Sequence, residues 1–165
     1  PRDVVVSYSK YRNLDYDTTI DYMIGSKLNV PFVRDVNNPS NIEIIGSWAF
    51  NYNSWKDGIL STPRIIIKYE DLLNNGLEIF TNLIKFLSEV MNLEVNNEKI
   101  ISSYSLSSFN NLKNFETKNN FFENNSTENF FRVGNSGNWK KELNKMQIKK
   151  IESNFKAEMK SLGYL

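Results

Sequence analysis

The strongest constraint on the fold is a run of isoleucines at residues 65–67, followed by a long amphipathic segment. An unbroken β-branched run favours a strand buried on both faces of a parallel sheet. Residues 77–91 then place Leu, Phe, Ile and Met at helical spacing. A strand followed by an amphipathic helix is half of a βαβ unit, so we predict an α/β fold. Tyr69 and Glu70 would lie at the carboxyl end of the strand, where such sheets bind ligands.

Further helices are predicted from apolar spacing and capping residues. Their ranges are 16–26, 47–55, 98–104, 107–113 and 144–162. Trp48 and Trp55 are seven residues apart on one helical face, so both are expected in the core. Residues 27–45 are expected to be a surface connection, and residues 114–129 a polar loop anchored by Phe121 and Phe122. One clear strand is too few for a complete sheet.

Composition narrows the range of functions. The chain has 165 residues, enough for one domain, with 40% hydrophobic and 24% charged residues. A net charge of +1 gives no polybasic surface for nucleic acid or an anionic membrane. Absence of Cys excludes disulfides and Cys-ligated metals, and absence of His removes the usual general base from this chain. No apolar run approaches the roughly 20 residues that span a bilayer.

A short Gly-containing stretch, residues 130–140, has the residue types of an anion site. Arg132 offers a planar fork of donors that suits phosphate. Gly134 and Gly137 allow the backbone to approach an anion and turn its N–H groups toward it. A surface turn with a solvated Arg132 accounts for the same residues, and local chemistry does not separate the two interpretations.

The first 13 residues also allow two interpretations. Three consecutive valines favour a strand in which Ser7 is merely hydrogen-bonded. Alternatively, Pro1 and Asp3 ahead of an apolar run are typical of a helix start, with Asp3 able to cap exposed N–H groups or to favour the positive end of the helix dipole. In a helix, Ser7 lies one turn after Asp3 on the same face, where its hydroxyl could donate to an anion.

Several segments, in this order, resemble the C-terminal half of a cytosolic-type sulfotransferase. The matching segments are 2–8, 46–48 with Trp55, 68–72, 107–109, 131–134 with Gly137, Trp139 and Lys140, and 159–164. The resemblance implies a P-loop-NTPase-like sulfotransferase fold, a parallel sheet flanked by helices. Here it would be an incomplete, helix-rich C-terminal portion, so residues 1–165 are expected to form a single partial domain.

The resemblance also implies an activity. Such enzymes transfer a sulfuryl group from 3′-phosphoadenosine 5′-phosphosulfate (PAPS) to a hydroxyl or amine of a small-molecule acceptor. The product of the donor is 3′,5′-phosphoadenosine (PAP), and no metal is expected. The protein would be cytoplasmic, without a nucleic-acid partner or a membrane segment in this chain.

Donor-binding residues follow from the same resemblance, position by position. Ser7 matches the helix serine on the 3′-phosphate, which favours the helical interpretation of its segment. Arg132 matches the arginine of an Arg-Lys-Gly motif on that phosphate, and Gly134 supplies a backbone contact beside Val133. The positions that match those lining the adenine are Tyr69, Ser107 and Phe109.

Departures from the family pattern are specific. Val133 replaces the lysine of Arg-Lys-Gly, and Asn51 stands where many relatives carry His. The residues after Trp139 lack the Thr-Val of a dimerisation motif, so the oligomeric state is left open.

The family's phosphosulfate loop, its lysine and its catalytic His lie in the first half, and the arginine that pairs with Ser7 falls before Pro1. Arg2 is in a different register. We therefore expect no catalytic residue in this chain, only an indirect role for Ser7, and no activity of this chain alone.

Two other functions stay open. One is another P-loop-type nucleotide kinase or transferase, which would bind ATP well. The other is a catalytically inactive nucleotide-binding or interaction module derived from this fold, which Val133 and the absence of His would suit.

Overall fold

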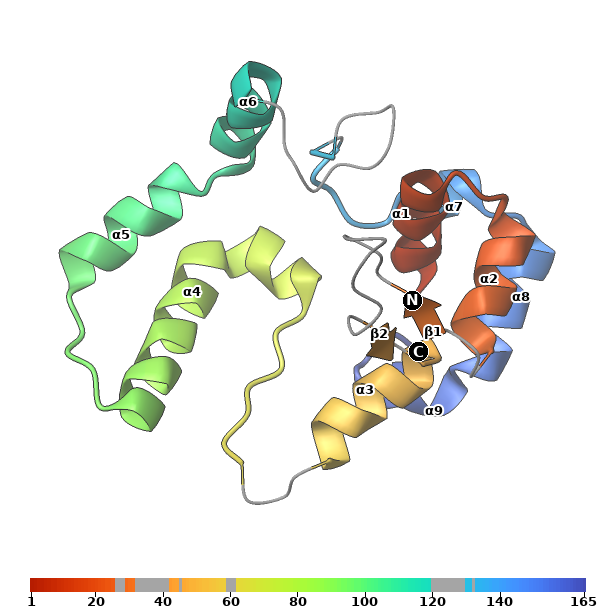
Figure 1. Cartoon of the computed structure of the whole chain (residues 1–165), viewed down its shortest axis with the longest axis horizontal. Coiled ribbons are helices and arrows are strands. Elements are labelled where there is room, and N and C mark those ends of the chain that lie inside the picture. The colour runs from red at the N-terminus through yellow and green to blue at the C-terminus, as the bar shows by residue number, and fades with distance from the viewer. Residues whose placement is uncertain (26–28, 32–41, 45, 59–61, 120–129, 132) are drawn as a thin grey trace. The chain divides into compact units, whose positions relative to one another are not determined.

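The computed structural model describes residues 1–25, 29–31, 42–44, 46–58, 62–119, 130–131 and 133–165. The chain divides into two compact units (Figure 1). Unit 1 comprises Pro1–Leu60 and Gly137–Leu165, and unit 2 comprises Ser61–Ser136. Each unit is described by itself.

Unit 1 is built mainly from helices contributed by both ends of the chain. They are α1 (Arg2–Arg12), α2 (Tyr16–Ile24), α3 (Trp48–Asp57), α7 (Trp139–Glu142), α8 (Lys145–Asn154) and α9 (Lys156–Ser161). The helix starts follow from their capping residues. Asp15 accepts a hydrogen bond from the Thr18 N–H, and Ser47 from that of Phe50. Asn144 and Gln147 form a capping box at the start of α8.

Two short strands complete the described part of unit 1. Strands β1 (Asn29–Pro31) and β2 (Ile42–Ile44) pair antiparallel, with Val30 opposite Glu43. Both fall inside the segment predicted as a surface connection, so that prediction missed a strand pair. The remaining residues of that connection lie outside the described residues.

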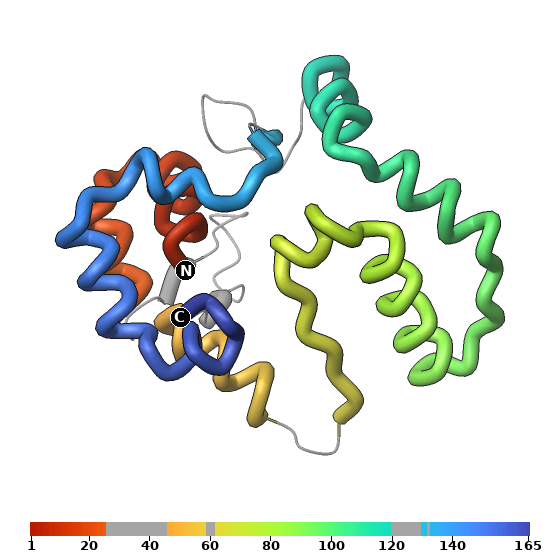
Figure 2. The backbone as a smooth tube through the Cα atoms, turned by 180° about the vertical axis from the view of Figure 1, so that it is seen from behind, coloured from red at the N-terminus to blue at the C-terminus, as the bar shows by residue number. Residues whose placement is uncertain are grey.

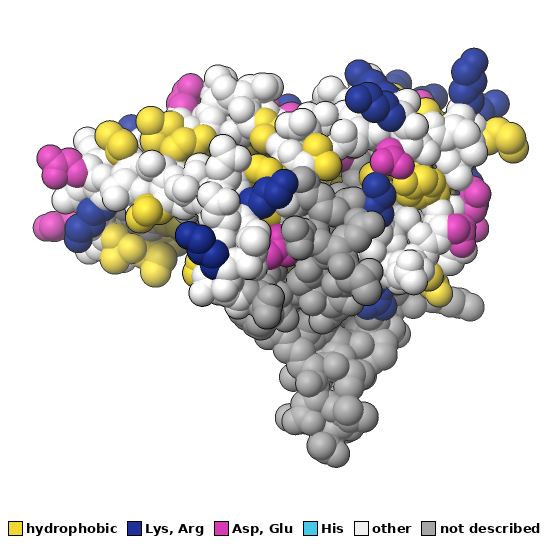
Figure 3. Space-filling model, turned by 90° about the horizontal axis from the view of Figure 1, so that it is seen from above, with side chains coloured by type: hydrophobic (Ala, Val, Ile, Leu, Met, Phe, Trp, Pro, Cys, Tyr) yellow, Lys and Arg dark blue, Asp and Glu magenta, His cyan; other side chains and the backbone are white. Residues whose placement is uncertain are grey.

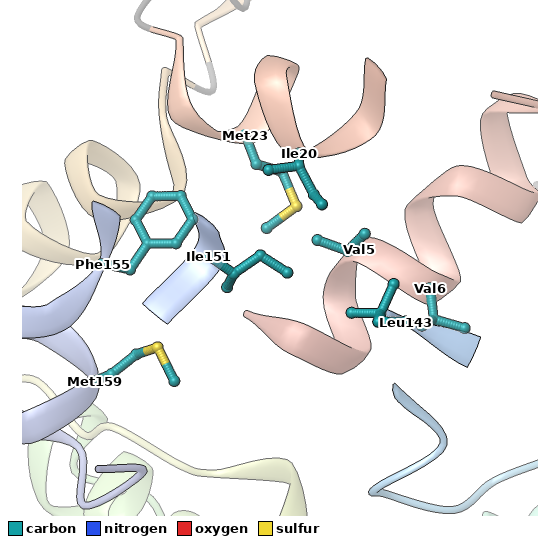
Figure 4. Close-up of a cluster of buried hydrophobic side chains, with 8 residues drawn as sticks. All are labelled: Val5, Val6, Ile20, Met23, Leu143, Ile151, Phe155 and Met159. Carbon is teal, nitrogen blue, oxygen red and sulfur yellow. The ribbon is translucent and has the colours of Figure 1, made fainter. Parts of the chain in front are cut away.

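The core of unit 1 is one cluster of buried side chains from the first and last helices (Figure 4). Its members are Val5, Val6, Ile20, Met23, Leu143, Ile151, Phe155 and Met159. Trp48 packs against this cluster, with its ring centroid 5.2 Å from that of Phe155. The predicted role of Trp48 in the core is therefore confirmed. Trp55 is 76% exposed, so its predicted role in the core is wrong.

The termini of the chain are joined within unit 1. A guanidinium N–H of Arg2 donates to the Tyr164 carbonyl oxygen at 3.2 Å, and the labels N and C lie close together in Figure 1. The predicted helix 144–162 is confirmed as α8 and α9, with a break at Phe155. Gly163 follows with a φ of 75°, which suits a glycine that ends a helix.

Unit 2 contains three successive helices, which the backbone tube in Figure 2 follows from yellow to green. They are α4 (Tyr69–Met91), α5 (Asn97–Leu106) and α6 (Phe109–Asn119). Helix α4 is kinked at Asn75. At the next residue, Gly76, the Tyr104 hydroxyl occupies the space that a Cβ would need, so α5 approaches α4 closely there.

Few apolar side chains of unit 2 are buried. Ile100 is the only buried hydrophobic residue of this unit among the described residues, whereas α4 alone leaves Leu73, Leu77, Val90 and Met91 exposed. Figure 3 shows hydrophobic side chains at the surface at the left of the view, the side on which Figure 1 has α4 and α5. Unit 2 therefore lacks, in its described part, the kind of core that unit 1 has.

The predicted α/β fold with a parallel sheet is wrong for the described residues. They are predominantly helical, and their strands are the antiparallel pair β1 and β2. The predicted strand 65–67 has no regular secondary structure, and Ile66 is 51% exposed. A β-branched run needs neighbouring strands to form a ladder, and the described elements of unit 2 are all helices. The predicted helix 77–91 is confirmed, but it starts earlier, at Tyr69.

Candidate functional site

Ser7 lies on the exposed face of α1. The opposite face carries Val5, Val6 and Ser9, which are buried, so the segment is an amphipathic helix and not a strand. Ser9 uses its hydroxyl to donate to the Leu14 carbonyl oxygen at 2.6 Å. Ser7 is thus the serine of α1 whose side chain is presented to solvent.

Asp3 binds a distant backbone segment instead of capping its own helix. Its carboxylate accepts hydrogen bonds from the N–H groups of Gly137 at 2.7 Å and Trp139 at 3.0 Å. Helix α1 has no side-chain cap, so Asp3 does not cap it, but Asp3 does lie in the first turn of α1, where a negative charge suits the helix dipole. The N–H groups near Gly137 are expected to turn toward an anion, and here the anion is the carboxylate of Asp3. A bound phosphate is therefore not needed to explain the conformation of this turn.

Arg2 is engaged in structural contacts. One guanidinium nitrogen lies 2.6 Å from a carboxylate oxygen of Glu152. The guanidinium also stacks over the Trp139 ring, 4.1 Å from its centroid. Arg2 and Asp3 thus both hold the segment that begins α7, which agrees with leaving Arg2 out of the predicted phosphate site.

Two predicted donor-site residues meet within unit 2. Gly134 has a φ of 65°, and a Cβ placed on it would lie 2.5 Å from a ring carbon of Phe109. The Phe109 ring also meets Phe131 edge-to-face, with centroids 6.4 Å apart. Only a residue without a side chain allows the ring to lie against the backbone here. Phe131 and Gly134 are therefore both packed against the first residue of α6.

Glu116 supplies a second attachment of the same segment, which the sequence analysis missed. It is 5% exposed, and its carboxylate accepts from the N–H groups of Phe130 at 2.5 Å and Phe131 at 3.0 Å. Two charge-assisted hydrogen bonds of this kind give a buried carboxylate the partners that it would otherwise find in water. Nothing in the sequence distinguishes this glutamate from one on a solvated helix face, because its partners lie 14 and 15 residues away.

The other predicted positions are also located, except one. Tyr69 is the first residue of α4 and is 50% exposed, and Ser107 is an exposed residue at the end of α5. Val133 is exposed as well, whereas Arg132 lies outside the described residues. Ser7 belongs to unit 1 and the others to unit 2, so their meeting at one ligand stays a prediction.

Among the described residues, no group of three or more acidic side chains has the arrangement of a metal site. No helix in that part of the chain is long and apolar enough to cross a membrane.

Comparison with known proteins gives two matches. Residues 1–163 match the sulfotransferase domain. Over 116 residues, the chain is 29% identical to sulfotransferase 1B1 of Canis lupus familiaris. That alignment covers 69% of this chain and 39% of the relative, so the aligned part spans well under half the length of that protein. Because the match to the domain extends over nearly every residue, the chain belongs to the sulfotransferase domain family.

Proposed function

We propose that the full-length protein is a sulfotransferase that uses PAPS to sulfate a hydroxyl or amine of a small-molecule acceptor. This chain would contribute to the 3′-phosphate and adenine half of the donor site. The observation that carries the proposal is the match of residues 1–163 to the family. The packing of Phe109 on Gly134, two positions assigned to the donor by resemblance, supports it.

The residue types suit the donor. Exposed hydroxyls at Ser7 and Ser107 can donate hydrogen bonds, and Phe109 with Tyr69 provides aromatic surface for a purine. Arg132 would pair bidentately with a phosphate. When bound, the donor supplies the sulfuryl group. The role proposed for Ser7 and Arg132 is to hold the 3′-phosphate, so that the distant reacting group is correctly aligned.

General base catalysis is assigned to groups outside this chain. The 165 residues contain no His, the side chain whose ordinary pKa best suits a base near neutral pH. The residues proposed here bind and orient the donor, and they neither accept nor deliver a proton. A variant lacking Ser7 or Arg132 should therefore lose donor affinity and keep the pH dependence of transfer.

A calorimetric titration of the full-length protein with PAP tests the proposal. Arg132→Ala should weaken binding by about 1.5–3 kcal/mol, because it removes a charge-assisted phosphate contact. Ser7→Ala should weaken binding by about 1 kcal/mol, as expected for a neutral hydroxyl donor. Ser103→Ala, an exposed serine of α5 outside the predicted site, is the matched control. If Arg132→Ala binds PAP with unchanged affinity, Arg132 does not bind the 3′-phosphate.

One observation favours a second candidate, an inactive nucleotide-binding module. Val133 is exposed where the family pattern has lysine, so a cation beside the phosphate is missing. The two candidates separate when PAPS labelled in its sulfuryl group is incubated with phenol, alcohol and amine acceptors. Transfer to any acceptor supports the enzyme, whereas PAP binding without any transfer supports the module.

A further inference from the structure

Helix α6 holds the segment 130–134 from one face. Phe109 and Glu116 are seven residues apart, two turns of helix, and therefore point to the same side. Phe109 packs on Gly134 and on the edge of Phe131, and Glu116 accepts the N–H groups of Phe130 and Phe131. Phe109, at the start of α6, thus contacts Gly134, at the end of the segment. Glu116, near the end of α6, holds the backbone at the start of the segment.

The two attachments differ in strength. The Phe109 contact is apolar and edge-to-face, and such ring contacts add a small attraction to that of the area they bury. The Glu116 contact joins a buried carboxylate to adjacent N–H groups and fixes the backbone direction at Phe131. Among the described residues of unit 2 few apolar side chains are buried, so this polar contact contributes to the order of the segment.

We propose that Glu116 is a positioning residue for the donor nucleotide: by holding the backbone of Phe130 and Phe131 it keeps Gly134 against Phe109. This inference rests on the proposed function, because only that function makes Phe109 and Gly134 part of a nucleotide site. It uses the placement of Phe109, Phe131 and Gly134, and not that of Arg132. Glu116 itself does not touch the donor.

The experiment compares Glu116→Ala and Glu116→Gln with the wild type in the full-length protein. Backbone amide exchange at Phe130 and Phe131 reports the contact, and PAP titration well below the melting temperature reports its effect on the site. Glu89→Gln removes the same charge from an exposed position of α4 and serves as the control.

Glu116→Ala should abolish the protection of both amides and raise the Kd for PAP about tenfold, since a loosened segment misplaces the groups that bind the ligand. Glu116→Gln should lie between this variant and the wild type, because an amide oxygen still accepts while its NH₂ group cannot. Glu89→Gln should match the wild type in both measurements. A purely structural role of Glu116 would lower the melting temperature without this graded loss of affinity.

The outcomes separate this inference from the proposed function. Faster exchange in Glu116→Ala with wild-type PAP affinity overturns the positioning role and leaves the proposed function intact. Unchanged exchange at Phe130 and Phe131 overturns the contact itself. If the wild type does not bind PAP, or Arg132→Ala binds it equally well, the proposed function fails and the positioning role fails with it, whatever the amides show.

Discussion

The two units of this chain are held together in different ways. Unit 1 has one continuous cluster of buried aliphatic, aromatic and methionine side chains, drawn from helices at both ends of the chain. Unit 2 buries a single hydrophobic side chain among its described residues, Ile100, and joins its helices and segments by individual contacts. Unit 1 is therefore stabilised by a hydrophobic core. Order in the described part of unit 2 depends instead on individual contacts of a few residues.

The largest expected effect is in the core of unit 1. Phe155 is 2% exposed and meets Trp48, so Phe155→Ala should lower the free energy of unfolding by about 3–5 kcal/mol. Phe115→Ala, at an exposed position of α6 in unit 2, should change it by less than about 1 kcal/mol. Urea unfolding followed by circular dichroism measures both. Equal losses would show that unit 2 has a core of its own.

A smaller loss is expected where unit 1 holds the segment before α7. Asp3→Ala removes an acceptor shared by the Gly137 and Trp139 N–H groups and should cost about 1.5–3 kcal/mol. Asp57→Ala, an exposed acidic position of α3, is the control and should have little effect. The same unfolding measurement applies. If the two variants unfold alike, Asp3 does not hold this segment in solution.

A pair of glycines sharpens the comparison between the units. Gly134 and Gly137 both have positive φ, so an alanine at either should cost about 1–2 kcal/mol of backbone strain. At Gly134 the new Cβ also meets the Phe109 ring, whereas at Gly137 nothing lies within 4 Å of it. Only Gly134→Ala should therefore weaken PAP binding as well. A similar loss of PAP affinity in both variants would contradict the role of the Phe109 contact.

The smallest effect concerns pH and the start of α2. Hydrogen bonds from the Thr18 side chain and backbone lower the pKa of Asp15 below its ordinary value. A lowered pKa in the folded state means that this carboxylate contributes stability above the unfolded pKa and loses the contribution as pH falls through the folded pKa. Asp15→Asn keeps a capping side chain but does not titrate.

The difference in melting temperature between the wild type and Asp15→Asn measures this contribution. It should be constant near neutral pH and shrink as pH falls below about 4. If the melting temperature of the wild type stays above that of Asp15→Asn in acid, the Asp15 cap stabilises α2 without its negative charge.

Local signals in the sequence predicted most helices of both units. Ser47 as an N-cap, Gly163 as a stop and the apolar spacing of residues 77–91 all act over one or two turns, so the helices they predict are the ones observed. The same holds for α2, α5 and the pair α8 and α9.

Long-range partners explain the failures. Residues 65–67 have strand propensity, but strand formation depends on neighbours that the described part of unit 2 does not provide. Trp55 shares a helical face with Trp48, yet α3 packs on the core only near its beginning, so Trp55 is exposed. Spacing alone does not show how far along a helix its packing partner extends.

The candidate site was predictable in part. Resemblance pointed to Phe109 and Gly134, and the structure packs the Phe109 ring against Gly134, whereas their role at a nucleotide stays a prediction. Glu116 and Asp3 could not be assigned their roles, since each binds backbone N–H groups far away in the sequence, and a backbone amide carries no residue-specific signal. The residues that hold the segment around Arg132 are therefore visible only in the structure.

The central claim is that the protein holds a nucleotide by its 3′-phosphate. The most direct test is a calorimetric comparison of PAP, AMP and ATP binding to the wild-type full-length protein. The claim predicts that PAP binds at least about 10-fold more tightly than AMP, the value of a charge-assisted phosphate contact, and that ATP competes poorly with PAP. Equal binding of PAP and AMP, or tighter binding of ATP than of PAP, would contradict it.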